Sequence, residues 1–101
     1  MIAPLVSIAP PRFFGVMGRY EEYRFGNGFF EVTIYRHRYF VTAALKVVGG
    51  NTEYFYTLCD GGVRPEYLDN KVWNDPQFAA ELAVCKFLSY AAKASQPGEV
   101  K

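Results

Sequence analysis

The sequence has few of the residues from which catalytic and metal sites are built. Its 101 residues include one histidine, His37, and two widely separated cysteines, Cys59 and Cys85. A hydrolytic triad needs a histidine beside a nucleophile and an orienting acid, and a zinc site needs several closely spaced ligands. The neighbouring Arg36 and Arg38 disfavour protonation of His37, so a general-base role for it is the weaker alternative. We expect no catalytic residue, no metal and two buried free thiols.

Nucleotide-binding motifs are also missing from the sequence. It contains neither a G-x-x-x-x-G-K-[ST] nor a G-x-G-x-x-G element; Gly26-Asn27-Gly28 supplies only the first three positions, and a hairpin turn explains these better. Glu21 and Glu22 are adjacent, so on a strand they point to opposite faces and cannot act as a carboxylate pair. We therefore expect no cofactor and a protein that is not an enzyme.

The chain lacks both an excess of charge of one sign and a long apolar run. Its net charge is +1, which gives no global attraction to nucleic acid or to an anionic membrane. No stretch approaches the roughly 18–20 apolar residues of a membrane span. The apolar N-terminus has neither the basic start nor the length of a signal peptide. We expect an intracellular, cytoplasmic protein with no membrane partner.

Aromatic residues, in contrast, are abundant. Nine Phe and eight Tyr contribute to an aromatic fraction of 18%, and a tyrosine keeps a polar tip that suits a wet or shared surface. The charges are divided unevenly: residues 1–50 hold six basic and three acidic residues, and residues 51–101 hold five basic and seven acidic residues. The basic residues of the first half are nearly all arginine, which favours stacked and bidentate contacts.

Alternating apolar residues and turn signals predict four consecutive strands. Gly26-Asn27-Gly28 and residues 49–52 are typical of tight turns, because glycine and asparagine tolerate positive φ. Period-two alternation predicts strands at residues 19–25, 29–35, 39–48 and 53–59. Short connections make these four strands an antiparallel meander.

Two details of the hairpins follow from this reading. Pairing across the first turn is expected to bring Tyr23 and Arg19 near Glu31 and Tyr35. Residues 36–38 contain no Gly, Pro or Asn, so they form either a short hairpin tip of three basic side chains or part of one bent strand. We favour the hairpin tip.

Asn74-Asp75-Pro76-Gln77 has the pattern of a helix start. Asn or Asp caps the first amides, Pro fits the first turn, and Gln completes a capping-box-like spacing. A chain of this length is too short for two cores, so we expect one α+β domain, a four-stranded antiparallel β-meander packed by one C-terminal α-helix. Its expected parts are an irregular N-terminal arm (1–12), the antiparallel sheet (13–59), a packed loop (60–74), the helix (75–94) and a frayed tail (95–101).

The predicted helix has two apolar stripes, although a helix on a sheet needs only one. At about 100° per residue, Phe78, Leu82 and Cys85 form the stripe that we expect to cover the sheet. The second stripe is either covered by another part of the chain or available for self-association as a homodimer, since large exposed apolar patches are rare on monomers. The candidate self-association residues are Ala80, Val84, Phe87 and Ala91.

Basic and aromatic residues alternate within the first hairpins. Such a surface can bind an acidic protein surface, because Tyr and Arg dominate protein hot spots, or it can stack bases and hold phosphates. Alternatively, the arginine stems merely cover rings and pair with glutamates. The near-zero net charge and the acidic second half favour a protein over nucleic acid. The expected partner-binding residues are Arg19, Tyr20, Tyr23, Arg24, Tyr35, Arg36, His37, Arg38 and Tyr39.

A short chain without catalytic motifs or targeting signals often acts by occluding another macromolecule. We therefore expect a non-enzymatic binding protein, an accessory or inhibitory protein of a phage or mobile element that occludes a protein partner. Two alternatives are a single-stranded nucleic-acid binder that uses the aromatic and arginine-bearing sheet surface, and a structural or assembly protein that acts through homo-oligomerisation.

Overall fold

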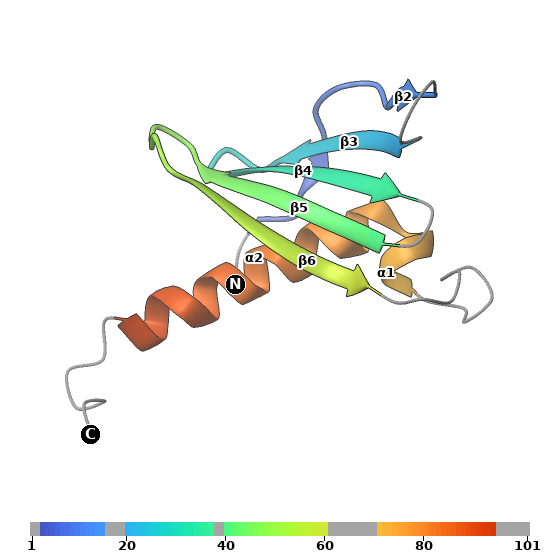
Figure 1. Cartoon of the computed structure of the whole chain (residues 1–101). Helices are drawn as coiled ribbons and strands as arrows, with labels where there is room; N and C mark the ends of the chain where they lie inside the picture. Colours follow the sequence, from blue (N-terminus) through green and yellow to red (C-terminus); the bar gives the residue numbers. More distant parts are fainter. Residues whose placement is uncertain (1–2, 16–19, 38–39, 61–70, 95–101) are drawn as a thin grey trace.

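The structure, a computed structural model, describes residues 3–15, 20–37, 40–60 and 71–94. The expected α+β class is confirmed: an antiparallel sheet is followed by one main C-terminal helix (Figure 1). The sheet has six strands rather than the predicted four, in the order β1-β3-β4-β5-β6, with β2 also paired to β3. The elements are β1 (Val6–Ser7), β2 (Arg12–Phe14), β3 (Tyr20–Gly26), β4 (Phe30–His37), β5 (Phe40–Val47), β6 (Glu53–Asp60), α1 (Lys71–Asn74) and α2 (Pro76–Ala94).

The sequence had suggested an irregular N-terminal arm, but the arm contains two short strands. Val6 and Ser7 pair with the end of β3, and Arg12–Phe14 pairs with its beginning. These strands have two and three residues, which is too short for an alternating pattern to reveal them. Near its end, β3 uses Gly26 because a Cβ there would lie 3.3 Å from the side chain of Ile8. The arm therefore closes one edge of the sheet.

The β3–β4 turn lies later in the chain than its glycines suggested. The Asn27 side-chain oxygen accepts hydrogen bonds from the amides of Phe29 and Phe30, each at 2.9 Å, and Gly28 has a φ of 89°. The turn is thus centred after Gly28, so Tyr23 pairs with Ile34 rather than lying near Glu31. This corrects the predicted register.

β4 continues into the segment that had been predicted as a hairpin tip. Arg36 and His37 are its last two residues, and they pair with Glu21 and Tyr20 of β3. The rest of the expected tip, Arg38, lies outside the described residues. The absence of Gly, Pro and Asn is consistent with this continuation, because nothing in those residues favours a turn.

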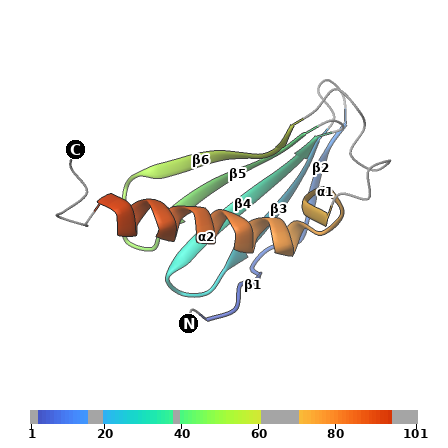
Figure 2. The same cartoon turned by 90° about the horizontal axis from the view of Figure 1, so that it is seen from below.

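The two faces of the sheet have different surroundings. α2 lies across one face, which we call the helix-covered face (Figure 2). The register places Tyr23, Ile34 and Ala43 on that face, and Arg24, Thr33 and Ala44 on the other, which we call the open face because no described helix lies on it. The core between sheet and helix comprises Leu5, Phe25, Phe30, Val32, Ile34, Val41, Ala43, Leu45, Ala79, Ala80, Ala83 and Val84.

The start of α2 matches the predicted cap. The Asp75 carboxylate accepts a hydrogen bond of 3.2 Å from the Phe78 amide, and Pro76 is the first helical residue. Gln77 does not complete a capping box; its side-chain amide donates to the Leu5 carbonyl at 2.7 Å and ties the N-terminal arm to the helix. The short helix α1 occupies the end of the segment that had been predicted as a loop.

The two stripes of α2 are reversed relative to the prediction. Ala80 and Val84 are fully buried, and the Phe87 ring packs on the rings of Phe30 (5.8 Å between centroids) and Tyr54 (4.9 Å). The stripe assigned to self-association therefore covers the sheet, with Ala91 half-buried at its end. The small residues Ala79, Ala80 and Ala83 explain why this side of α2 faces the sheet, because they let the helix approach the sheet closely.

The other predicted stripe faces outward. Phe78 and Leu82 are half-buried and Cys85 is exposed. The two cysteines were expected to be buried, but Cys85 is exposed and Cys59 is only partly buried. Neither described helix is long and apolar enough to cross a membrane.

Candidate functional site

Strand alternation divides the predicted partner-binding residues between the two faces of the sheet. The register brings Tyr20, Arg24, Tyr35 and His37 together on the open face, and it places Tyr23 and Arg36 on the helix-covered face. The remaining three, Arg19, Arg38 and Tyr39, lie outside the described residues. The predicted site is therefore two groups of side chains with different surroundings.

Arg36 belongs to a bonded group that we call the Arg36 cluster, formed with Glu21, Tyr23 and Trp73. Its Nε and Nη2 atoms lie 2.7 and 2.5 Å from the Glu21 carboxylate. The guanidinium also donates to the Trp73 carbonyl and to the Tyr23 hydroxyl, each at 3.0 Å. The Tyr23 hydroxyl in turn donates to Glu21 at 2.9 Å. Each of the three guanidinium nitrogens of Arg36 thus donates at least one hydrogen bond within the cluster.

The Arg36 cluster attaches α1 to the sheet. The Arg36 guanidinium stacks 4.6 Å from the Trp73 ring, and the Trp73 indole donates to the His37 carbonyl at 2.8 Å. Burial, followed by the hydrogen bond to Glu21, raises the pKa of Tyr23 above its ordinary value. The Arg36 side chain is only 18% exposed. Its contacts therefore support a structural role for Arg36 rather than the partner-binding role expected from the sequence.

Four rings form a continuous row across one end of the open face, and we call Phe14, Tyr20, His37 and Phe40 the aromatic row. The ring of Phe14 stacks on that of Tyr20 at 4.6 Å, Tyr20 lies 5.2 Å from His37, and His37 lies 4.0 Å from Phe40. The row crosses β2, β3, β4 and β5 in order. Tyr35 adds an edge contact to Tyr20 at 5.8 Å. All five side chains are half-exposed.

His37 is held between the rings of Tyr20 and Phe40. Its partial burial lowers its pKa below the ordinary histidine value, so the neutral ring is favoured at neutral pH. A neutral imidazole between Tyr20 and Phe40 acts as a fourth aromatic surface in the row. Burial and the charge of Glu22 likewise raise the pKa of Tyr35 and keep its hydroxyl protonated.

The charged side chains of the open face balance one another. Among the described side chains, the basic ones are Arg12, Arg24 and Lys46, and the acidic ones are Glu22, Glu31 and Glu53. Lys46 is paired in register with both Glu31 and Glu53, and Arg12 lies 3.8 Å from Glu22. The described side chains of this face therefore carry no excess of positive charge to hold a phosphate backbone.

The sequence alone did not identify two members of the aromatic row. Phe14 belongs to a strand too short to be predicted, and Phe40 was assigned to a strand but not to a site. Knowledge of the register would have found both. Phe14 pairs with Tyr20 and Tyr20 pairs with His37, and the pairing of Arg36 with Val41 puts the next residues, His37 and Phe40, side by side.

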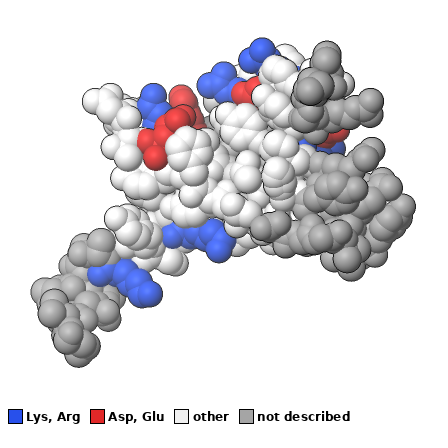
Figure 3. All heavy atoms as spheres, viewed as in Figure 1, with Lys and Arg blue, Asp and Glu red and all other residues white. Residues whose placement is uncertain are grey.

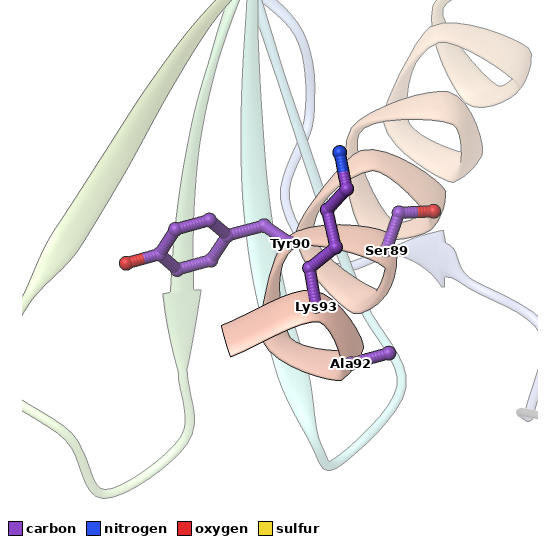
Figure 4. A pocket seen from close by; sticks show the side chains of 4 residues that line it. All are labelled: Ser89, Tyr90, Ala92 and Lys93. Carbon is purple, nitrogen blue, oxygen red and sulfur yellow. The ribbon is translucent and has the colours of Figure 1, made fainter. Parts of the chain in front are cut away.

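Other possible ligand sites in the described part of the chain are slight. Ser89, Tyr90, Ala92 and Lys93 line a shallow hollow on the last turns of α2 (Figure 4). No group of three or more His, Cys, Asp or Glu side chains in the described residues is arranged to hold a metal ion. The open face thus remains the most developed candidate site.

No protein-family model, curated protein or solved structure matches this chain.

Proposed function

We propose that the protein is a non-enzymatic binding protein that contacts another protein through its open face. The observation that carries the proposal is the aromatic row, in which four rings in contact, one pair stacked and two pairs tilted, lie half-exposed on a sheet face without a described helix. Aromatic side chains supply large contact area and are enriched among the residues that dominate protein binding energy.

The contacts between neighbouring rings of the row favour binding. Each ring is already held by its neighbours, at centroid distances of 4.0 to 5.2 Å. These rings therefore lose less conformational freedom when a partner binds than isolated surface rings would, and this lowers the entropic cost of association. The open face can thus act as a preformed platform.

The balance of charge supports a protein partner. Arg12, Arg24 and Lys46 alternate with Glu22, Glu31 and Glu53 over the same face. A partner with both signs of charge around an apolar centre is complementary to that pattern, and such complementarity selects partners and orients them. Among the described side chains, a phosphate backbone meets as many carboxylates as basic groups.

A second candidate is binding of single-stranded nucleic acid. It is supported by the row itself, on which bases can stack, and by Arg12, whose guanidinium lies 5.0 Å from the Phe14 ring. It predicts a mobility shift of a labelled oligonucleotide that weakens as salt rises and is reduced by Arg12→Ala. Absence of any shift at low salt eliminates it.

The proposal is tested by photo-crosslinking from two positions of the folded protein in its native cells. A photo-crosslinking phenylalanine derivative at Thr42, which pairs with Tyr35 on the open face, is expected to give discrete protein adducts. The same group at the exposed Glu81 on α2 is the matched control and is expected to give few. Equal adducts from both positions, or none from Thr42, contradict the proposal, and nuclease-sensitive adducts favour the second candidate.

Two expectations from the sequence do not enter this proposal. Self-association through the α2 stripe is set aside because Ala80 and Val84 are buried against the sheet. The inhibitory role in a phage or mobile element stays a prediction from the sequence.

A further inference from the structure

The two edges of the sheet are protected to different degrees. In the described part of the chain, β6 pairs only with β5, whereas β3 is paired on its outer side by both β1 and β2. Residues 53–57 of β6 pair with β5 in a continuous register, which ends at a shift opposite Val41 and Thr42. These five residues include no proline and no lysine, with which proteins commonly protect an edge strand.

Apolar and aromatic side chains flank this edge on both faces. On the open face, Phe55 is 70% exposed. On the helix-covered face, Tyr54 and Tyr56 are half-buried, and the ring of the exposed Tyr90 lies 6.4 Å from that of Tyr54. Burial and the neighbouring Tyr54 and Tyr90 hydroxyls raise the pKa of Tyr56 above its ordinary value. A strand added here therefore meets rings on either side.

The helix places positive charge beside the same edge. Lys86, Tyr90 and Lys93 are spaced by four and three residues, so they share one stripe of α2. The contact between Tyr90 and Tyr54 places that stripe next to β6. Figure 3 shows basic side chains along the helix below an uncharged band of the surface, and Figure 4 shows Tyr90 and Lys93 on adjoining turns. Glu81 lies on the opposite side of the helix at about 100° per residue.

We propose that β6 binds an extended acidic segment of another protein, which adds a strand to the sheet. The backbone of that segment pairs with residues 53–57, as in other cases of strand addition. Its apolar side chains lie beside Phe55 on the open face, and its carboxylates on the other face meet Lys86 and Lys93. This edge is separate from the aromatic row, so the inference goes beyond the proposed function.

Charge argues against a second copy of this chain as the occupant. Antiparallel pairing of two β6 strands around a two-fold axis leaves both α2 helices on the same face of the joined sheet. The Lys86 and Lys93 stripes of the two copies then face the same junction, and like charges brought together disfavour the pairing. An acidic segment instead neutralises one such stripe.

The test begins with a labelled seven-residue peptide that alternates Val and Glu, added to the wild-type protein. Fluorescence anisotropy is expected to show binding that weakens as salt rises. The matched peptide that alternates Val and Lys is expected to bind at least tenfold more weakly. Equal binding of the two peptides overturns the charge argument.

Backbone methylation of the Val and Glu peptide separates strand addition from other modes of binding. Successive residues of a strand direct their amides to opposite edges, so methylation of alternate amides in one phase blocks the edge that faces β6, and methylation in the other phase does not. One phase is expected to weaken binding at least tenfold and the other to have little effect. Tolerance of both phases overturns the proposal.

A charge swap locates the peptide on the molecule. The variant with Lys86→Glu and Lys93→Glu is expected to prefer the lysine peptide, whereas Arg12→Glu with Arg24→Glu, which changes the net charge equally, is expected to keep the wild-type preference. Unchanged preference in the swapped variant overturns the proposal. A wild-type dimer in sedimentation that Phe55→Lys dissociates also overturns it, since a second copy then occupies the edge.

Discussion

The two faces of the sheet differ in what their side chains contact, although the same strands supply both. On the helix-covered face, Ile34, Val41 and Leu45 are completely buried, and Arg36 is bonded to its neighbours. On the open face, the rings of the aromatic row contact one another yet are half-exposed. Alternate residues of one strand thus have different surroundings: they lie in the core on one face, and on the other face they form the surface that we propose contacts a partner.

The comparison shows why residue type alone is a poor guide to the site. Arg36 and Arg24 are both arginines in adjacent strands, but Arg36 is enclosed by the Arg36 cluster and Arg24 is exposed. An arginine with its donors satisfied inside the molecule is a structural residue, whereas an exposed one is available to a partner. The predictions below test this division.

The largest expected effect follows from removing the Ile34 side chain in the middle of the helix-covered face. Ile34→Ala is expected to lower the free energy of unfolding by about 3 kcal/mol, because it removes buried methyl groups and leaves a cavity. Its neighbour Thr33, on the open face, is the control: Thr33→Ala is expected to cost only about 0.5 kcal/mol. Urea unfolding compares the two, and equal losses contradict the division of the faces.

Removal of the Arg36 guanidinium is expected to have the next largest effect. Arg36→Ala removes the guanidinium donors to the Glu21 carboxylate and to the Trp73 carbonyl, and the expected loss is about 2 kcal/mol. Arg24→Ala, at an exposed position, is expected to change stability by at most about 0.5 kcal/mol. Thermal unfolding measures both, and a neutral Arg36→Ala disproves the structural role.

The N-terminal cap of α2 is expected to contribute less. Asp75→Ala removes the acceptor for the Phe78 amide and is expected to cost about 1 kcal/mol. Asn74→Ala is the control, because Asn74 ends α1 and is exposed. Helix content by circular dichroism during urea unfolding reports the change. A greater loss of stability in Asn74→Ala than in Asp75→Ala would contradict the assignment of the cap to Asp75.

The smallest expected effect is the pH dependence caused by His37. Burial lowers the pKa of its ring below 6.5, so the unfolded chain takes up this proton at a higher pH than the folded protein does. The stability from the neutral ring is complete above pH 6.5 and is lost as pH falls toward the folded pKa. His37→Phe keeps a ring in the row and is expected to remove this part of the pH dependence.

The His37 ring gives a direct measurement, because the chain has only this histidine. Its NMR signals are expected to titrate below pH 6.5. When the pH is lowered from 7.5 to 5.5, the urea concentration at the midpoint of unfolding is expected to decrease more for the wild type than for His37→Phe. A ring that titrates above 6.5 contradicts the burial between Tyr20 and Phe40.

Local patterns in the sequence were sufficient for much of the fold. Alternation predicted β3 to β6 with ends within a few residues, and Asp75-Pro76 predicted the start of α2. These signals are local, because period-two alternation and capping depend on neighbouring residues alone. β1 and β2 were missed because strands of two and three residues have no such pattern.

The candidate site was harder to predict because it depends on pairing between distant residues. A turn centred after Gly28 rather than on Asn27 changes every cross-strand partner, and with it the neighbours of Tyr23. The bonds from Arg36 to Trp73 join residues far apart in the chain. Both stripes of α2 were apolar, so only packing against the sheet could decide that Val84 lies inside.

The most direct test of the division between faces is the yield of the protein adduct from the photo-crosslinker at Thr42, per folded molecule, in two further variants. Tyr20→Ser with Tyr35→Ser alters the open face, and Ile34→Val costs about 1 kcal/mol on the helix-covered face without altering the open face. We expect at least a tenfold lower yield in the tyrosine variant and an unchanged yield in Ile34→Val. A full yield from the tyrosine variant would contradict the assignment of contact to the open face.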